Sequence, residues 1–140
     1  MSQENVEIVR QLYELVLASG RVEDPAMAEI VPRFFDPEVE VRQMSRMLDT
    51  AGEFHGYKGL ADSVREVIGP FAALRWVPEE IRAAGDQVAA AVSVSGAGRL
   101  SGAPIEIRIG HLFTLRDGRV VRFEVFDDPA HAFRAAGLSE

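Results

Sequence analysis

The chain has 140 residues, of which 47% are hydrophobic and 26% charged, a composition typical of one folded domain and not of a disordered segment. Its formal net charge of -7, with fifteen Lys and Arg residues that form no basic run, argues against nonspecific binding to nucleic acids. The absence of cysteine excludes disulfides, thiolate catalysis and zinc–cysteine sites.

The first residues, MSQENVEIVRQLYELV, are acidic and amphipathic, whereas a signal peptide begins with basic residues and continues with an apolar core. No apolar stretch of the sequence is long enough to span a bilayer. We therefore expect a cytoplasmic protein without a membrane partner.

The first half of the chain predicts three helices and a short strand. Apolar residues recur at helical spacing between Ser2, which can cap the helix, and Gly20, which supplies the stop. A second helix is predicted from Pro25, with Asp24 as its cap, to Pro32. The strand and the third helix are predicted at residues 38–44 and 59–68.

The second half predicts an antiparallel meander and a last helix. Turn residues separate the four runs of β-type residues, which cover 74–83, 87–95, 104–115 and 119–127. Asp128 caps a helix that Pro129 opens and Gly137 closes. Helices followed by a meander predict one α+β domain over residues 1–140, whose antiparallel sheet is covered on one face.

Odd-numbered residues of the last two runs form one apolar face, made of Ile105, Ile107, Ile109, His111, Phe113, Leu115, Val121, Phe123, Val125 and Asp127. A two-residue loop would pair odd positions with even ones, so we expect a three-residue loop at 116–118 with glycine last. This register places His111 opposite Phe123, and Asp127 opposite Ile107.

Three polar residues on apolar faces are candidates for chemistry. The imidazole of His111 titrates near neutral pH and can act as an acid, a base or a donor that polarises a carbonyl. In an apolar pocket, Asp127 would have a raised pKa and serve as a base, and Tyr13 lies on the buried stripe of the first helix. Each has a structural alternative: a hydrogen-bonded core histidine, a solvated carboxylate at the rim and a packed core tyrosine.

Glu40 and Arg42 alternate with Val39 and Val41, and the pattern leaves open which pair points inward. Trp76 lies on a strand, where it forms either a wall or an interface. No metal-ligand spacing relates the three histidines, and no dinucleotide fingerprint lies before a helix, so we expect neither a metal nor a cofactor.

Five segments, taken in order, resemble the SnoaL-like branch of the nuclear-transport-factor-two-like superfamily: the opening helix ending in LASGR, FFDPEVEV, FHGYKGL, GHLFTLRDGRVVRFEVF and DPAHAFRAAGL. The resemblance covers nearly the whole chain and implies a cone, in which a curved antiparallel or mixed sheet wraps around three N-terminal helices and encloses a pocket, with a short C-terminal helix. Ketosteroid isomerase and scytalone dehydratase share this cone, and dimers are common in the superfamily, so we expect a homodimer. Because the fold hosts isomerases, cyclases, dehydratases, epoxide hydrolases and non-enzymes, the resemblance implies no single reaction.

The family's working residues are matched in part. Tyr13 matches the tyrosine that donates to the substrate oxygen in ketosteroid isomerases, and His111 falls where those enzymes carry their second donor. Their base falls on Arg42, which stays protonated at ordinary pH. The acid–base pair of the SnoaL-like cyclases falls on Phe123 and Val125. The resemblance thus implies a donor pair without the bases of either group.

The sequence favours a cofactor-independent isomerase, cyclase or dehydratase that acts on a mostly apolar carbonyl compound. Tyr13 and His111 would be the donors and Asp127 the base. We expect the small molecule to contact Glu40, Arg42, Trp76, Phe113, Phe123 and Val125. A non-catalytic binder of the same fold and a dimeric scaffold are the alternatives.

Overall fold

The computed structural model describes residues 2–19, 25–43, 52–68 and 71–138. Helices dominate its first half and long strands its second, as the patterning predicts. The elements are α1 (Ser2–Ser19), α2 (Pro25–Phe34), β1 (Phe35–Gln43), β2 (Gly52–His55), α3 (Gly56–Ile68), β3 (Phe71–Ala84), β4 (Gln87–Gly98), β5 (Pro104–Arg116), β6 (Arg119–Phe126) and α4 (Pro129–Ala135).

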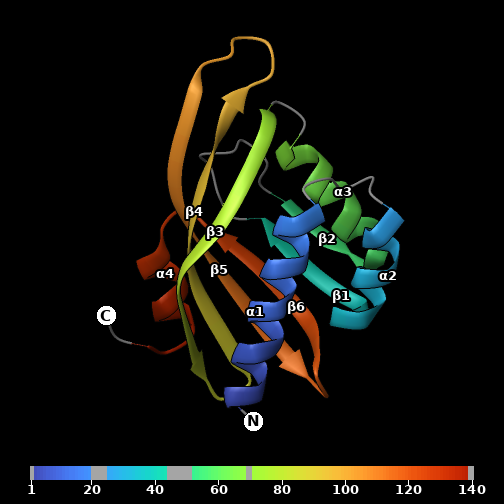
Figure 1. Cartoon of the computed structure of the whole chain (residues 1–140). Helices are drawn as coiled ribbons and strands as arrows, with labels where there is room; N and C mark the ends of the chain where they lie inside the picture. Colours follow the sequence, from blue (N-terminus) through green and yellow to red (C-terminus); the bar gives the residue numbers. More distant parts are fainter. Residues whose placement is uncertain (1, 20–24, 44–51, 69–70, 139–140) are drawn as a thin grey trace.

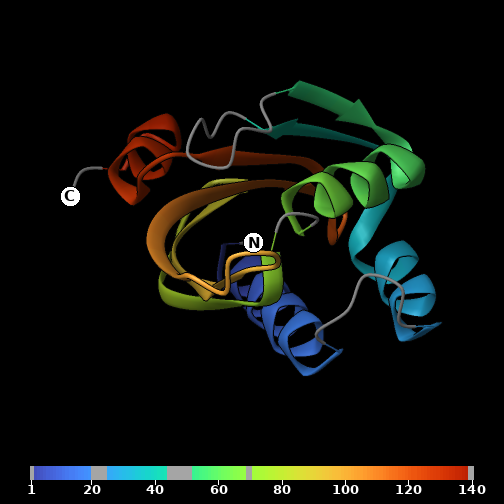
Figure 2. The same cartoon turned by 90° about the horizontal axis from the view of Figure 1, so that it is seen from above.

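The strands form one six-stranded sheet in the order β2-β1-β6-β5-β4-β3. The pairing of β1 with β6 is parallel, and the other pairings are antiparallel. Figures 1 and 2 show that the sheet curves strongly without closing, so that β2 and β3 remain its two edges. The predicted α+β fold with a curved, mixed sheet is confirmed.

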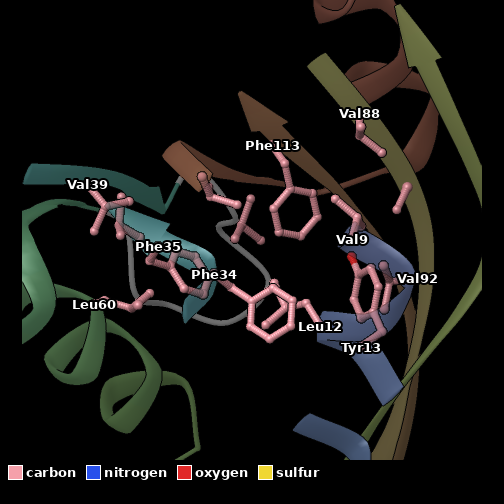
Figure 3. Close-up of a cluster of buried hydrophobic side chains, with 14 of the residues drawn as sticks. Val9, Leu12, Tyr13, Phe34, Phe35, Val39, Leu60, Val88, Val92 and Phe113 are labelled. Carbon is pink, nitrogen blue, oxygen red and sulfur yellow. The ribbon is translucent and has the colours of Figure 1, made fainter. Parts of the chain in front are cut away.

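The three N-terminal helices pack on the concave face of the sheet, as predicted. Each contributes buried side chains to the main core: Val9, Leu12 and Tyr13 from α1, Ile30 and Phe34 from α2, and Leu60 from α3. Figure 3 shows the labelled helix side chains of this set facing those of the strands, among them Val39, Val88, Val92 and Phe113. Burying one large apolar side chain contributes about 1.5–3 kcal/mol, so this helix–sheet core is the main source of stability.

The C-terminal helix α4 covers the convex face instead (Figures 1 and 2). Its side chains form a second core with the outward residues of three strands; the members are Ala89, Ala91, Leu112, Phe126, Ala132 and Phe133. The carboxylate of Asp128 accepts a hydrogen bond from the backbone N–H of His131 at 2.9 Å, which confirms the predicted cap. Since helices cover both faces here, residues 109–113 are all buried and do not alternate.

Gly110 allows the close approach of α4 to β5. A Cβ atom at this position would lie 2.6 Å from Cβ of Ala132 and 2.8 Å from the backbone oxygen of Asp128. Side chains of ordinary size do not fit into such a contact, so the helix would have to move away from the strand.

The variant Gly110→Ala is therefore expected to lose about 3 kcal/mol of unfolding free energy, as overpacked sites do. Urea unfolding measures this loss. Gly52→Ala is the matched control, because the nearest atom to its added Cβ is a ring carbon of Phe54 at 3.6 Å. Equal unfolding midpoints for the two variants would contradict the close packing of α4.

The turn between β5 and β6 differs from the prediction. Arg116 pairs with Arg119, which leaves a two-residue loop of Asp117 and Gly118 and not a three-residue loop. Both loop residues have positive φ, 53° and 81°, as a type I′ turn requires. The predicted three-residue loop is wrong because Asp-Gly itself supplies the twist that joins the strands.

A bulge restores the register that the shorter loop would have shifted. The pairing moves by one residue between Thr114 and Leu115, and Val121 is the residue passed over. As a result, odd residues still face odd residues beyond the bulge, but His111 lies opposite Val125 and not opposite Phe123. The predicted pairing of Asp127 with Ile107 is also wrong, because β6 ends at Phe126 opposite Gly110.

Two smaller differences concern the first half. Helix α2 continues through Pro32 to Phe34, since a proline in the last turn removes only one of the final hydrogen bonds. The short strand β2 was not predicted. The predicted cap at Asp24 and the stop at Gly20 lie outside the described residues.

Candidate functional site

A buried tyrosine–histidine pair lies at the centre of the concave face. The hydroxyl oxygen of Tyr13 is 2.6 Å from Nδ1 of His111, and each residue is only 6% exposed. Tyr13 follows Val9 by four positions, which places both on the stripe of α1 that faces the sheet. His111 lies on the concave face because it has the same parity on β5 as Ile109 and Phe113. The structure thus joins two of the three predicted catalytic residues.

Phenyl rings surround this pair. The imidazole of His111 meets the ring of Phe123 edge to face at a centroid distance of 4.9 Å and that of Phe113 at 6.0 Å. The Tyr13 ring meets Phe113 edge to face at 5.8 Å, and Phe113 stacks on Phe123 at 4.9 Å. These contacts fix both rings of the pair and keep water away from the hydrogen bond.

Burial keeps both groups of the pair neutral. Desolvation lowers the pKa of His111 to about 3 and raises the pKa of Tyr13 well above its usual value of 10. Near pH 7 the imidazole therefore carries one N–H hydrogen and the phenol keeps its O–H hydrogen. A histidine with so low a pKa is a poor general base at this pH, but its neutral ring still donates a hydrogen bond.

The pair has one hydrogen to spare. If the Tyr13 hydroxyl donates to Nδ1, the ring hydrogen of His111 lies on Nε2 and is free. If Nδ1 donates to the phenol oxygen, the O–H hydrogen of Tyr13 is free. In either tautomer, one N–H or O–H hydrogen of the pair remains available to donate a hydrogen bond to a bound molecule.

Other predicted contact residues also lie on the concave face. Val125 is the cross-strand neighbour of His111 and is 4% exposed, and Phe113 and Phe123 pair directly with each other. Trp76 is half-buried on β3 and packs against the same core. The structure therefore brings an apolar wall together around the Tyr13–His111 pair.

Glu40 and Arg42 do not join this wall. Val39 and Val41 are 0% and 1% exposed and take the inward side of β1, so the charged pair points outward. On the convex face, Nε of Arg122 donates to Oε2 of Glu40 at 3.2 Å. Arg42 forms an ion pair with Glu53 at 3.7 Å. The expected contact of these two residues with a small molecule beside His111 is not supported, because the valines occupy that side.

Asp127 directly follows β6 and is half-buried, next to the exposed cap residue Asp128. It stands two residues beyond Val125, at the end of the strand that carries the wall. The register between β5 and β6 ends one residue earlier, at Phe126.

Gln43 is a buried polar residue that the sequence reasoning missed. It is 5% exposed and continues the inward alternation of Val39 and Val41 to the end of β1. Its Oε1 atom is fully buried and has no hydrogen-bond partner in the part of the chain that the structure describes. The sequence contains a pattern that could have identified this residue. Alternate residues of a strand point to the same face, so the face that buries Val39 and Val41 also buries Gln43.

A hollow of about 220 Å³ lies between α1 and β3, lined by Arg10, Tyr13, Glu14, Pro78, Glu79, Glu80 and Ile81. Most of these residues are charged, so this is not the enclosed apolar pocket expected from the sequence. That pocket stays a prediction.

Neither a cluster of metal ligands nor a membrane-spanning helix is present within the described ranges. No three His, Asp or Glu side chains among the described residues gather as metal ligands do. Likewise, none of the helices described is both long and apolar enough to cross a bilayer.

Comparisons with known proteins agree with this fold. Residues 9–123 match the model of the SnoaL-like domain family. Similar solved structures include an NTF2-like protein of unknown function from Burkholderia pseudomallei K96243, with 22% identity, coverage of 97% of this chain and 98% of that chain, and a TM-score of 0.73. TerC, co-crystallised with polyporic acid, has 22% identity, coverage of 95% and 97%, and a TM-score of 0.73.

SalBIII, described as an epoxide hydrolase/cyclase-like enzyme with a role in pyran ring formation in the polyether salinomycin, has 21% identity, coverage of 89% and 90%, and a TM-score of 0.67. No curated protein matches the chain. At these identities the solved structures show a common fold and no common activity. The family match covers most of the chain, and the chain belongs to the SnoaL-like domain family.

Proposed function

We propose that this protein binds a mostly apolar carbonyl compound inside the cone and catalyses its isomerisation, cyclisation or dehydration without a cofactor. The observation that carries the proposal is the buried hydrogen bond of 2.6 Å between Tyr13 and His111, with its one spare hydrogen. Donors held in a dry, rigid site stabilise developing charge far better than donors in water.

The spare hydrogen would bind the carbonyl oxygen, where negative charge develops in an enolate-like transition state. Asp127 would take the proton from the adjacent carbon. The electrons of the broken C–H bond then form a carbon–carbon double bond, and the carbonyl π electrons move to the oxygen. His111 is not assigned as the base, because burial lowers its pKa to about 3.

The apolar side chains around the Tyr13–His111 pair support an apolar substrate. Phe113, Phe123, Val125 and Trp76 would contact its carbon frame, since they line the concave face on both sides of the pair. A cyclase-like enzyme among proteins of the same fold is consistent with this chemistry. Cytoplasmic location and homodimer formation are further parts of the proposal.

A non-catalytic binder is the second candidate, and one observation favours it. Both members of the polar pair are neutral, and the hydrogen bond that joins them involves no carboxylate. In a binder the pair would only orient the carbonyl, as the few polar groups of an apolar site do. A dimeric scaffold is the third candidate and predicts that no carbonyl compound binds.

The probe 2-acetonaphthone separates these candidates, because its methyl protons lie next to a carbonyl on an apolar two-ring frame. We expect the protein to catalyse exchange of these protons in D2O, followed by NMR. Tyr13→Phe should slow the exchange about a hundredfold, as removal of one preorganised donor does, and Asp127→Asn should abolish it.

Tyr57→Phe is the matched control, since the Tyr57 hydroxyl donates to the backbone oxygen of Phe35 at 2.9 Å, in a different hydrogen bond. It should exchange the probe at the wild-type rate. Binding of 2-acetonaphthone without any exchange would favour the binder. Equal exchange by Tyr13→Phe and Tyr57→Phe would overturn the assignment of the pair.

A further inference from the structure

Gln43 places an amide in the same concave surface as the tyrosine–histidine pair. The β1–β6 register pairs it with Val125, and the β5–β6 register pairs Val125 with His111. Paired residues of neighbouring strands project from the same face, so the three side chains form one row across the sheet. Strands lie about 4.8 Å apart, which places Gln43 and His111 roughly 10 Å from each other with Val125 between them.

The neighbours of Gln43 in this row cannot satisfy its amide. Val125 has an apolar side chain, and Gly52, the cross-strand partner on β2, has none. The buried Oε1 atom accordingly has no hydrogen-bond partner among the described residues. Leaving a buried polar atom unpaired is costly, and most such atoms in folded proteins have a partner. A group that enters the cone from outside would remove this cost.

A hydroxyl is the group that fits the amide. It donates a hydrogen bond to Oε1, and it can also accept one from the amide N–H. A carbonyl can only accept, and it is already matched by the spare hydrogen of the Tyr13–His111 pair. The two hydrogen-bonding groups therefore have different chemistry, since the Gln43 oxygen accepts a hydrogen bond and the Tyr13–His111 pair donates one. They lie at opposite ends of the row, with the apolar side chain of Val125 between them.

We propose that Gln43 binds a hydroxyl of the substrate, and that the substrate is a hydroxy ketone whose hydroxyl and carbonyl lie at opposite ends of a rigid apolar frame. Its frame would lie over Val125, its carbonyl at Tyr13 and His111, and its hydroxyl at Gln43. This inference rests on the proposed function, because it takes the Tyr13–His111 pair as the carbonyl site.

Two probes that differ by one hydroxyl test the inference. Titration calorimetry compares 2-acetonaphthone with 6-hydroxy-2-acetonaphthone, which carries the hydroxyl at the far end of the same two-ring frame. We expect the wild-type protein to bind the hydroxy ketone about fivefold to tenfold more tightly, the gain of one neutral hydrogen bond. Gln43→Met, of similar length but without the amide, should bind both probes equally.

A second readout separates a binding role from a structural one. Without a probe, Gln43→Met should unfold at a higher temperature than the wild-type protein, because the variant buries no unpaired oxygen. With 6-hydroxy-2-acetonaphthone in excess, the wild-type protein should gain more in melting temperature than the variant does. A glutamine that only supported the fold would give a lower melting temperature on substitution, and this result would overturn the inference.

The results also distinguish this inference from the proposed function. If both ketones bind and Tyr13→Phe weakens both, but the hydroxyl adds nothing, the role of Gln43 is wrong and the carbonyl site stands. If neither ketone binds, or if Tyr13→Phe changes the affinity for neither, the carbonyl site is wrong and the role of Gln43 falls with it.

Discussion

Acidification from pH 7 to pH 3 is expected to remove about 4 kcal/mol of unfolding free energy through His111 alone. Burial lowers the pKa of this residue from 6.5 to about 3, and a tenfold change in proton affinity corresponds to about 1.4 kcal/mol. Between these two values the unfolded chain binds a proton that the folded chain does not. The stability is therefore complete above pH 6.5 and decreases as the pH falls toward 3.

Urea unfolding at pH 7 and at pH 4.5 measures this effect. At pH 4.5 the wild-type protein should have lost between about 2 and 3 kcal/mol through the histidine, and His111→Gln should lose that much less between the two pH values. His131→Gln is the control, because His131 is exposed on α4. All three proteins contain the same carboxylates, so the comparison isolates the effect of the histidine. A pH dependence that is the same in His111→Gln and the wild type would contradict the neutral buried imidazole.

The second large effect is expected from Phe113→Ala, which should lose about 4 kcal/mol of unfolding free energy. Phe113 is 2% exposed and contacts the rings of Tyr13, His111 and Phe123. Truncation leaves a cavity at the point where the helix and two strands meet, and the rings around it cannot all move in to fill it.

Urea unfolding measures this loss of unfolding free energy. The control Leu100→Ala should change the unfolding free energy by less than about 0.5 kcal/mol, because Leu100 is fully exposed. The exchange of 2-acetonaphthone protons should also slow in Phe113→Ala, since the Tyr13–His111 pair loses the ring that positions it. An unfolding free energy within 1 kcal/mol of the Leu100→Ala value would show that this site collapses easily or is not closely packed.

Local patterns predicted the elements well and the hairpin register poorly. Alternation placed His111, Phe113, Phe123 and Val125 on one face, and the structure keeps them there. The pairing of His111 with Phe123 failed because parity only requires that odd residues meet odd residues. A loop of three residues and a loop of two residues with a bulge at Val121 both meet this condition. Choosing between them needs the backbone angles of Asp117 and Gly118.

The sequence could predict those features of the candidate site that depend only on which face of a helix or strand is buried, because the spacing of apolar residues indicates that face. Tyr13 and His111 could be named because each interrupts an apolar stripe. Their hydrogen bond could not be derived, since it depends on how α1 crosses β5, 98 residues later. The inward side of β1 stayed open in the sequence because Glu40 and Arg42 have the same alternation as the valines. In the structure, Val39 and Val41 are the residues of β1 that point inward, because they pack against α3. Gln43 has the same parity as the valines and therefore also points inward.

The parallel pairing of β1 with β6 has a consequence for synthesis on the ribosome. Strand β6 lies between β1 and β5, so the N-terminal strands have no link to the rest of the sheet until β6 has been made. At the usual pace of translation, the ribosome needs several seconds to pass from β1 to β6. During that interval the emerging helices α1 and α2 expose apolar surface that a chaperone could hold. A stalled or truncated product that lacks β6 would consequently be an early target for proteases.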